Sequence, residues 1–175
     1  MILLDSARYA HLRRGIEAGL IAGVPQVLLS KAEEKLFLPA NEDADLGPRL
    51  ITRLARWAKE PLPEDTKWLA ASAFHFGYAA AWGAAYAALY QRRPMRPWVG
   101  GLLLGGVIYG ISFPAWGVAV RTGVERKPRS RSWRMEAVLA TAAFSFGLGT
   151  ALVYDRGPRR TLRERLRARW LEAKS

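Results

Sequence analysis

The sequence predicts an all-α integral membrane protein, a bundle of four transmembrane helices. Half of its 175 residues are hydrophobic, and the charged residues gather in blocks between long apolar runs, as they do in multispan membrane proteins. Aromatic residues stand at most ends of these runs, where interfacial anchors belong. The net charge of +12 falls in the expected loops and tail, beside lipid headgroups, so we do not expect nucleic acid as a partner.

Four apolar segments carry the prediction of four spans. Residues 68–90 and 98–120 are each 23 residues long and contain no formally charged side chain at neutral pH. At about 1.5 Å of rise per residue, such a helix crosses a hydrocarbon core of roughly 30 Å. Residues 137–154 form a shorter uncharged span. The first span, about 15–38, is the least regular, because it contains Pro25 and reaches into a group of charged residues.

Two further helices are expected outside the hydrocarbon core. Residues 49–59 place apolar side chains on one face and basic ones on the other, which predicts an interfacial helix; packing against a soluble partner is the alternative. Residues 156–175 form a basic amphipathic tail. We expect its arginines to contact anionic lipid headgroups, and the alternative is a topology signal without lipid specificity. These arginines are Arg159, Arg160, Arg163 and Arg167.

An even number of spans places both termini on the same side of the membrane. This side carries 14 Lys and Arg residues, in residues 1–14, 91–97 and 156–175, and the other side carries 12, in residues 35–67 and 121–134. Because positively charged loops tend to stay in the cytoplasm, we expect both termini to be cytoplasmic. The basic loop 121–134 favours the reverse orientation.

Small residues at four-residue spacing predict close packing of the helix backbones. They fit a compact bundle, and a homodimer interface is the alternative. Pro25 and Pro114 are expected to kink the first and third spans, since proline removes a helical hydrogen bond. The glycines concerned are Gly15, Gly19 and Gly23 in the first span, and Gly101, Gly105, Gly106 and Gly110 in the third.

Polar residues inside a bilayer are costly, so each is a candidate functional residue. Lys31 and Glu34 have the i, i+3 spacing at which side chains pair on one helix face. His75 lies inside the second span, where a histidine is a candidate proton relay or sensor. Glu136, at the start of the fourth span, falls on the same membrane face, so the four are a candidate intramembrane network. The alternatives are a plain interfacial salt bridge and a neutral histidine bonded to a backbone carbonyl.

No enzyme motif is visible in the sequence. There is no G-x-S-x-G, no H-E-x-x-H and no phosphate-binding glycine loop. Cysteine is absent, and two histidines are too few for a histidine metal cluster. We therefore expect a protein that is not an enzyme and that holds no metal or cofactor.

Three stretches, GLIAGVPQVLLSKAEE, HFGYAAAWGAAYA and ISFPAWGV, together resemble the YagU-like family of small bacterial inner-membrane proteins. The resemblance covers roughly residues 15–155, and ISFP is its most specific motif. The sequence departs from the family at Tyr109 and Ala140, where the family has histidines. The matching positions are Lys31, Glu34, Pro39, His75, Ile111 to Pro114, Gly117 and Glu136.

The resemblance implies a location more than an activity. It implies a small protein of the bacterial inner membrane, in a family for which a link to acid tolerance has been proposed. Together with the absence of enzyme motifs, this leads us to expect a non-enzymatic membrane protein that acts in acid or envelope-stress tolerance or as an accessory subunit of a membrane complex. The alternative is a small oligomeric, proton-linked transporter or channel built around the polar network. Expected partners are anionic membrane lipids and either further copies of the chain or a larger membrane complex.

Overall fold

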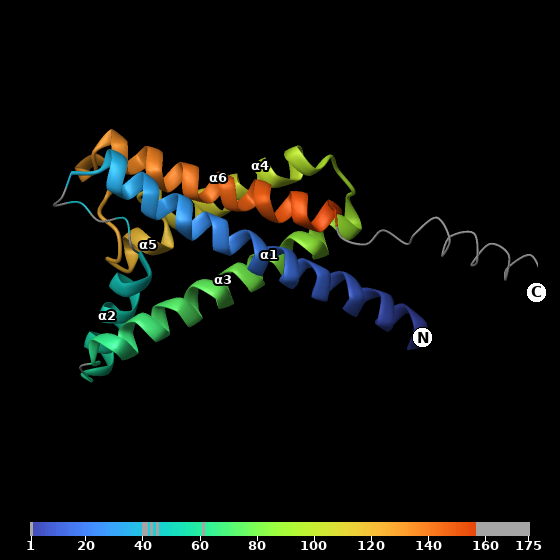
Figure 1. The fold of residues 1–175 in the computed structure, drawn as a ribbon, viewed down its shortest axis with the longest axis horizontal. Helices are drawn as coiled ribbons and strands as arrows, with labels where there is room; N and C mark the ends of the chain where they lie inside the picture. The colour runs from blue at the N-terminus through green and yellow to red at the C-terminus, as the bar shows by residue number, and fades with distance from the viewer. Residues whose placement is uncertain (1, 40–41, 43, 45, 61, 157–175) are drawn as a thin grey trace, which may run out of the picture.

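The computed structural model of the protein describes residues 2–39, 42, 44, 46–60 and 62–156. The described part is helical, which confirms the all-α prediction (Figure 1). Its long helices are α1 (Ile2–Phe37), α3 (Glu64–Arg92), α4 (Pro97–Ser112) and α6 (Trp133–Arg156). Its shorter elements are α2 (Leu46–Ala58), α5 (Val118–Arg121) and the 3-10 helix η1 (Pro128–Ser130).

The long helices form two closely packed pairs. α1 crosses α3, α4 packs along α6, and α6 also lies along α1. Figure 1 shows α1 and α3 as an open X, so that their ends separate on either side of the crossing. At one of these open ends α2 packs against α3 and α5 lies nearby. The two short helices therefore stand where the long ones diverge.

Glycines make the crossing of α1 and α3 possible. A Cβ atom on Gly19 would lie 2.1 Å from the carbonyl oxygen of Ala79, and one on Gly83 would lie 2.1 Å from the carbonyl oxygen of Gly15. Distances this short exclude any side chain at the crossing, so backbone touches backbone. This confirms close packing at Gly15 and Gly19. Gly23, one turn further, is in milder contact, because its Cβ would lie 3.3 Å from the Cβ of Ala79.

A second glycine contact joins α4 to α6. A Cβ on Gly105 would lie 2.7 Å from the Cα of Phe144, and one on Gly147 would lie 2.3 Å from the carbonyl oxygen of Gly101. The prediction that Gly101 and Gly105 pack closely is therefore confirmed.

Gly106 and Gly110 make no such contact within the described part of the chain, so the close packing expected inside the bundle is not formed at these two positions. A Cβ on Gly106 would meet only the ring of Phe144, at 3.9 Å, and one on Gly110 would meet nothing within 4 Å. Gly106 and Gly110 follow Gly105 by one and five positions. Residues with these spacings do not lie on the same face of a helix, so both glycines point away from the contact made by Gly101 and Gly105.

The third expected helix, 98–120, is broken in the structure. α4 ends at Ser112, a turn follows in which the amide of Gly117 donates to the carbonyl of Pro114 over 2.7 Å, and α5 begins at Val118. The expected kink at Pro114 is therefore an end, because proline provides no amide hydrogen and clashes with the preceding turn. Pro25, in contrast, lies within the continuous helix α1.

The other boundaries agree more closely with the sequence. α1 includes the expected first span but begins at Ile2. α2 matches the helix expected at 49–59. The basic tail lies outside the described residues from 157 onward, and with it the expected lipid contacts of Arg159, Arg160, Arg163 and Arg167. Within the described ranges, α6 is the one helix both long and apolar enough to cross a membrane, and α4 is apolar over 16 residues.

Because Gly105 is in close contact with α6 and Gly110 is not, we expect alanine substitutions at these two positions to change stability in opposite directions. Gly105→Ala forces a Cβ against the backbone of Phe144 and is expected to lower the free energy of unfolding by about 1–3 kcal/mol. Gly110→Ala has open space and is expected to raise it by up to about 1 kcal/mol through helix propensity. Denaturant titrations followed by circular dichroism measure both. Equal effects of the two substitutions would contradict the packing described.

Candidate functional site

A cavity of about 370 Å³ lies between the diverging ends of α1 and α3. This volume is within the range of roughly 300–1,000 Å³ that is typical of small-ligand sites. The wall is mostly apolar and receives residues from α1, α2, α3, α4, α5 and α6. Its polar members include Gln26, Ser30, Lys31, Glu34, His75 and Thr122.

Three of the four residues of the expected network line this cavity: Lys31, Glu34 and His75. The Nζ of Lys31 lies 3.5 Å from a carboxylate oxygen of Glu34, so the predicted i, i+3 pair is formed. The Nε2 of His75 lies 3.4 Å from the carbonyl oxygen of Gly23. The ring can approach the α1 backbone because Gly23 has no side chain. The histidine therefore binds a backbone carbonyl, which was the alternative interpretation.

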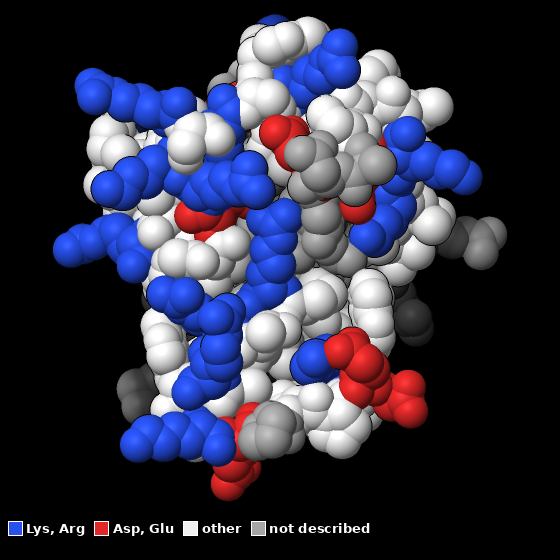
Figure 2. Space-filling model, turned by 90° about the vertical axis from the view of Figure 1, so that its left-hand side faces the viewer, with Lys and Arg blue, Asp and Glu red and all other residues white. Residues whose placement is uncertain are grey.

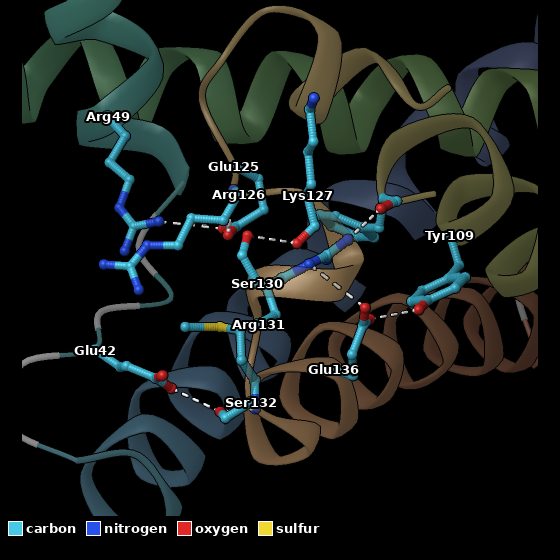
Figure 3. A network of polar contacts seen from close by, with 12 residues as sticks. Glu42, Arg49, Tyr109, Glu125, Arg126, Lys127, Ser130, Arg131, Ser132 and Glu136 are labelled. Carbon is cyan, nitrogen blue, oxygen red and sulfur yellow. Dashed lines mark hydrogen bonds and ion pairs between the residues drawn. The ribbon is translucent and has the colours of Figure 1, made fainter. Parts of the chain in front are cut away.

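Glu136 belongs to a different set of contacts. It accepts a hydrogen bond of 2.7 Å from the hydroxyl of Tyr109, and its other oxygen lies 3.4 Å from the Nε of Arg131 (Figure 3). It is not part of the cavity wall. The structure therefore divides the candidate network between the cavity and this second site.

Arg131 supplies a hydrogen bond to a backbone carbonyl at the point where the third expected helix is interrupted. Its side chain is 1% exposed and donates to the carbonyl oxygen of Phe113. In a continuous helix that carbonyl would accept from the amide of Gly117, but this amide bonds to Pro114 instead. A buried carbonyl without a donor is unfavourable, so the guanidinium replaces the lost backbone donor.

A buried ion pair connects α2 to the loop after α5. The Nη1 of Arg49 lies 3.1 Å from Glu125, whose side chain is only 1% exposed, and the amide of Arg126 donates to the second carboxylate oxygen over 2.7 Å. Figure 3 shows these contacts beside those of Arg131. Together they hold α2 across the end of the cavity.

A third link begins α6. The hydroxyl of Ser132 accepts a hydrogen bond of 3.1 Å from the amide of Met135 and donates one of 2.8 Å to Glu42. A serine in this position satisfies an amide that the first helical turn leaves free. The first loop is thereby attached to the start of α6.

Sequence reasoning did not identify Arg49, Glu125 or Arg131 as a structural unit. One signal existed: Glu125 is the only acidic residue between 121 and 134, a stretch with six Lys and Arg residues. An isolated acid among basic residues is a natural partner for one of them. Nothing in the sequence distinguishes Arg131 from its basic neighbours.

The start of α1 and the end of α6 are joined at the opposite end of the bundle. Arg14 donates to the backbone carbonyls of Tyr154 and of Asp155, the latter over 3.3 Å, and its guanidinium lies 4.8 Å from the centre of the Tyr154 ring. His11 contacts the Tyr154 hydroxyl at 3.0 Å. A cation at a helix C-terminus satisfies free carbonyls and complements the helix dipole.

The cavity combines polar and apolar surface. Its polar groups are engaged with one another or with backbone, and its larger surface is apolar. Among the described residues, no group of three or more acidic or histidine side chains is placed to hold a metal ion.

A scan against protein-family models found no match, and searches of curated proteins and of solved structures found no similar chain. The resemblance to the YagU-like family therefore stays a prediction, and functional inference depends on the geometry above.

Removal of the Arg131 side chain tests whether its hydrogen bond to the Phe113 carbonyl and its ion pair with Glu136 stabilise the fold. In Arg131→Met the Phe113 carbonyl and the Glu136 carboxylate lose a buried donor, and we expect the free energy of unfolding to fall by about 2–5 kcal/mol. Arg134→Met, at an exposed position three residues later, is the matched control and should change it by less than about 0.5 kcal/mol. Equal losses in the two variants would contradict the role of Arg131.

Proposed function

We propose that this chain is a non-enzymatic, multipass protein of the bacterial inner membrane with both termini in the cytoplasm. In this proposal α1, α3, α6 and the broken unit of α4 and α5 span the bilayer, and α2 lies at the interface. The protein serves as an accessory subunit of a membrane complex or in tolerance of acid or envelope stress, and it contacts anionic lipids.

The observation that carries the proposal is the distribution of side-chain size. Small residues fill the helix contacts: Ala18, Ala79 and Ala87 are at most 1% exposed. Many large apolar residues point outward, among them Leu28 at 68% and Leu69 at 72% exposure. In water this arrangement would leave an extensive apolar surface exposed. In a bilayer it is favourable, because lipid covers the large side chains and small residues let backbones approach.

Two further features support the proposed topology. Arg14, in the N-terminal half of α1, is bonded to the end of α6, so that the N-terminal half of α1 and the end of α6 lie toward one end of the bundle. The segment 121–134 and α2 lie at the opposite end, where Figure 2 shows many Lys and Arg side chains. The chain therefore passes between two polar ends separated by apolar helix surface.

Labelling of introduced cysteines tests this topology directly, because the chain has no cysteine of its own. Ser130→Cys and Gln91→Cys place thiols at exposed positions of the two ends. We expect a membrane-impermeant maleimide to label position 130 in intact cells and position 91 only after the inner membrane is permeabilised. Labelling at 91 alone would invert the orientation, and labelling of both in intact cells would contradict the four-span arrangement.

A second candidate is a small oligomeric, proton-linked transporter or channel. The observation that favours it is that Lys31, Glu34 and His75 line the same cavity. Their side chains would then carry the coupling charge or proton, a frequent role of ionisable residues in membranes.

Flux in proteoliposomes distinguishes the two candidates. If the chain is a transporter or channel, wild type dissipates an imposed proton or solute gradient and the His75→Ala/Glu34→Gln variant does not. Glu17→Gln, which alters an exposed pair with Arg13 outside the cavity, is the control and should behave as wild type. Under the leading proposal none of the three proteins changes the leak of empty liposomes, and the protein co-purifies with a larger assembly.

A further inference from the structure

We propose that the cavity binds one acyl chain of an anionic phospholipid, whose headgroup phosphate is held by Arg53. This inference rests on the proposed membrane location and adds a specific ligand site to it. The site differs from the headgroup contacts expected of the basic tail, because it includes an internal apolar space and its residues all lie within the described part of the chain.

The cavity wall is mainly polar on α1 and mainly apolar on α4 and α6. Lys31 and Glu34, with side chains 47% and 23% exposed, lie at the end near α2. On α4 and α6 the wall is formed by buried apolar residues, among them Ile108 and Phe146 at 5% and 6% exposure, whereas Gln26 and His75 add polar groups nearer the crossing of α1 and α3. An amphiphile with a polar head and a hydrocarbon chain matches this order of surfaces, since the chain gains from apolar burial while the head stays at the interface.

Arg53 is the cation best placed for the phosphate. It lies on α2, one turn after Leu50 of the cavity wall, and its Nη2 would be 2.8 Å from a Cβ on Gly123. Gly123, with a φ of +69°, stands between the wall residues Thr122 and Val124. The guanidinium therefore lies against the backbone between two residues of the cavity wall.

The arginines near this end differ in their partners. Arg49 is paired with Glu125, and Arg131 with Glu136. Arg53 contacts the ring of Trp57 at 5.9 Å, and its buried Nε has no hydrogen-bond partner among the described residues. A buried guanidinium nitrogen without an acceptor is unfavourable. A phosphate oxygen would satisfy it, because arginine presents several donors in a planar arrangement suited to phosphate.

In this proposal the acyl chain enters laterally, between α3 and α4. α3 packs closely with α1 but makes few contacts with α4. At the level of the cavity these two helices are connected by a hydrogen bond of 3.3 Å between the hydroxyls of Tyr78 and Ser112, both of which line the space. Tyr78 is 36% exposed. An acyl chain in the surrounding leaflet can therefore enter between α3 and α4 without crossing the polar end of the molecule.

The charge of this end selects an anionic headgroup. Figure 2 shows many Lys and Arg side chains at this end, with Asp and Glu side chains in several places among them. Within it, α2 and residues 121–134 carry nine Lys and Arg residues and one acidic residue, Glu125. Such a surface attracts acidic phospholipids over zwitterionic ones. Arg53 then adds a defined contact to this general attraction.

Native mass spectrometry of the full chain tests the headgroup contact. The probe is an equimolar mixture of phosphatidylglycerol and phosphatidylcholine, added to protein purified and delipidated in mild detergent. We expect wild type to retain one phosphatidylglycerol per chain, with at least tenfold preference over phosphatidylcholine. Arg53→Gln should lose this preference. Arg56→Gln, which removes an exposed arginine of the same helix, should keep it.

A second pair of variants tests the internal space. Ala142→Trp fills the cavity, whereas Ala73→Trp adds the same side chain at an exposed position of α3 outside the wall. We expect the first to lose retained lipid and the second to keep it, with circular dichroism and melting temperature showing that both fold.

Several results would overturn the inference: no retained lipid in wild type, equal retention of the two lipids, or equal losses in the two members of either variant pair. A wild-type chain that requires detergent for extraction yet retains no lipid overturns only the lipid site. A chain that is recovered in the soluble fraction without detergent overturns the proposed membrane function itself.

Discussion

The backbone contact between α1 and α3 determines most of the other features. At Gly15, Gly19 and Gly83 the two helices approach so closely that no side chain fits between them. Straight helices in contact at one point must separate away from it, so they diverge toward their ends (Figure 1). The cavity, the position of α2 and the separation of the two polar ends all follow from this crossing.

Where α1 and α3 diverge, polar side chains rather than helix packing connect the surrounding elements. There the third helix is interrupted at Pro114, and the chain returns through a loop to α6. Arg131 satisfies the carbonyl that the interruption leaves free, and the pair of Arg49 and Glu125 holds α2 in place. These side chains replace helix packing with buried hydrogen bonds. They are also the reason that the cavity has a defined wall at this end.

The sequence predicted correctly those features that depend only on residues close together in the chain. The helical segments, the amphipathic α2 and the pairing of Lys31 with Glu34 depend on periodicity and local spacing. The sequence did not predict which face of one helix packs against another helix. Equal spacing made Gly106 and Gly110 look like Gly101 and Gly105, but spacing does not tell which face of α4 meets α6. The separation of Glu136 from His75 has the same cause, because a shared membrane face does not specify a shared cavity.

The sequence alone determined that this protein is helical, where its apolar segments lie and that it lacks thiol chemistry, because composition and periodicity act within a segment. The tertiary structure alone decided that Pro114 ends a helix, that Arg131 and Glu125 are buried, and that Arg53 lies beside an apolar cavity without an acidic partner among the described residues. These properties depend on contacts between residues far apart in the chain. Their geometry is set only when the helices cross, since a side chain's partners are chosen by the packing of the backbones that carry it.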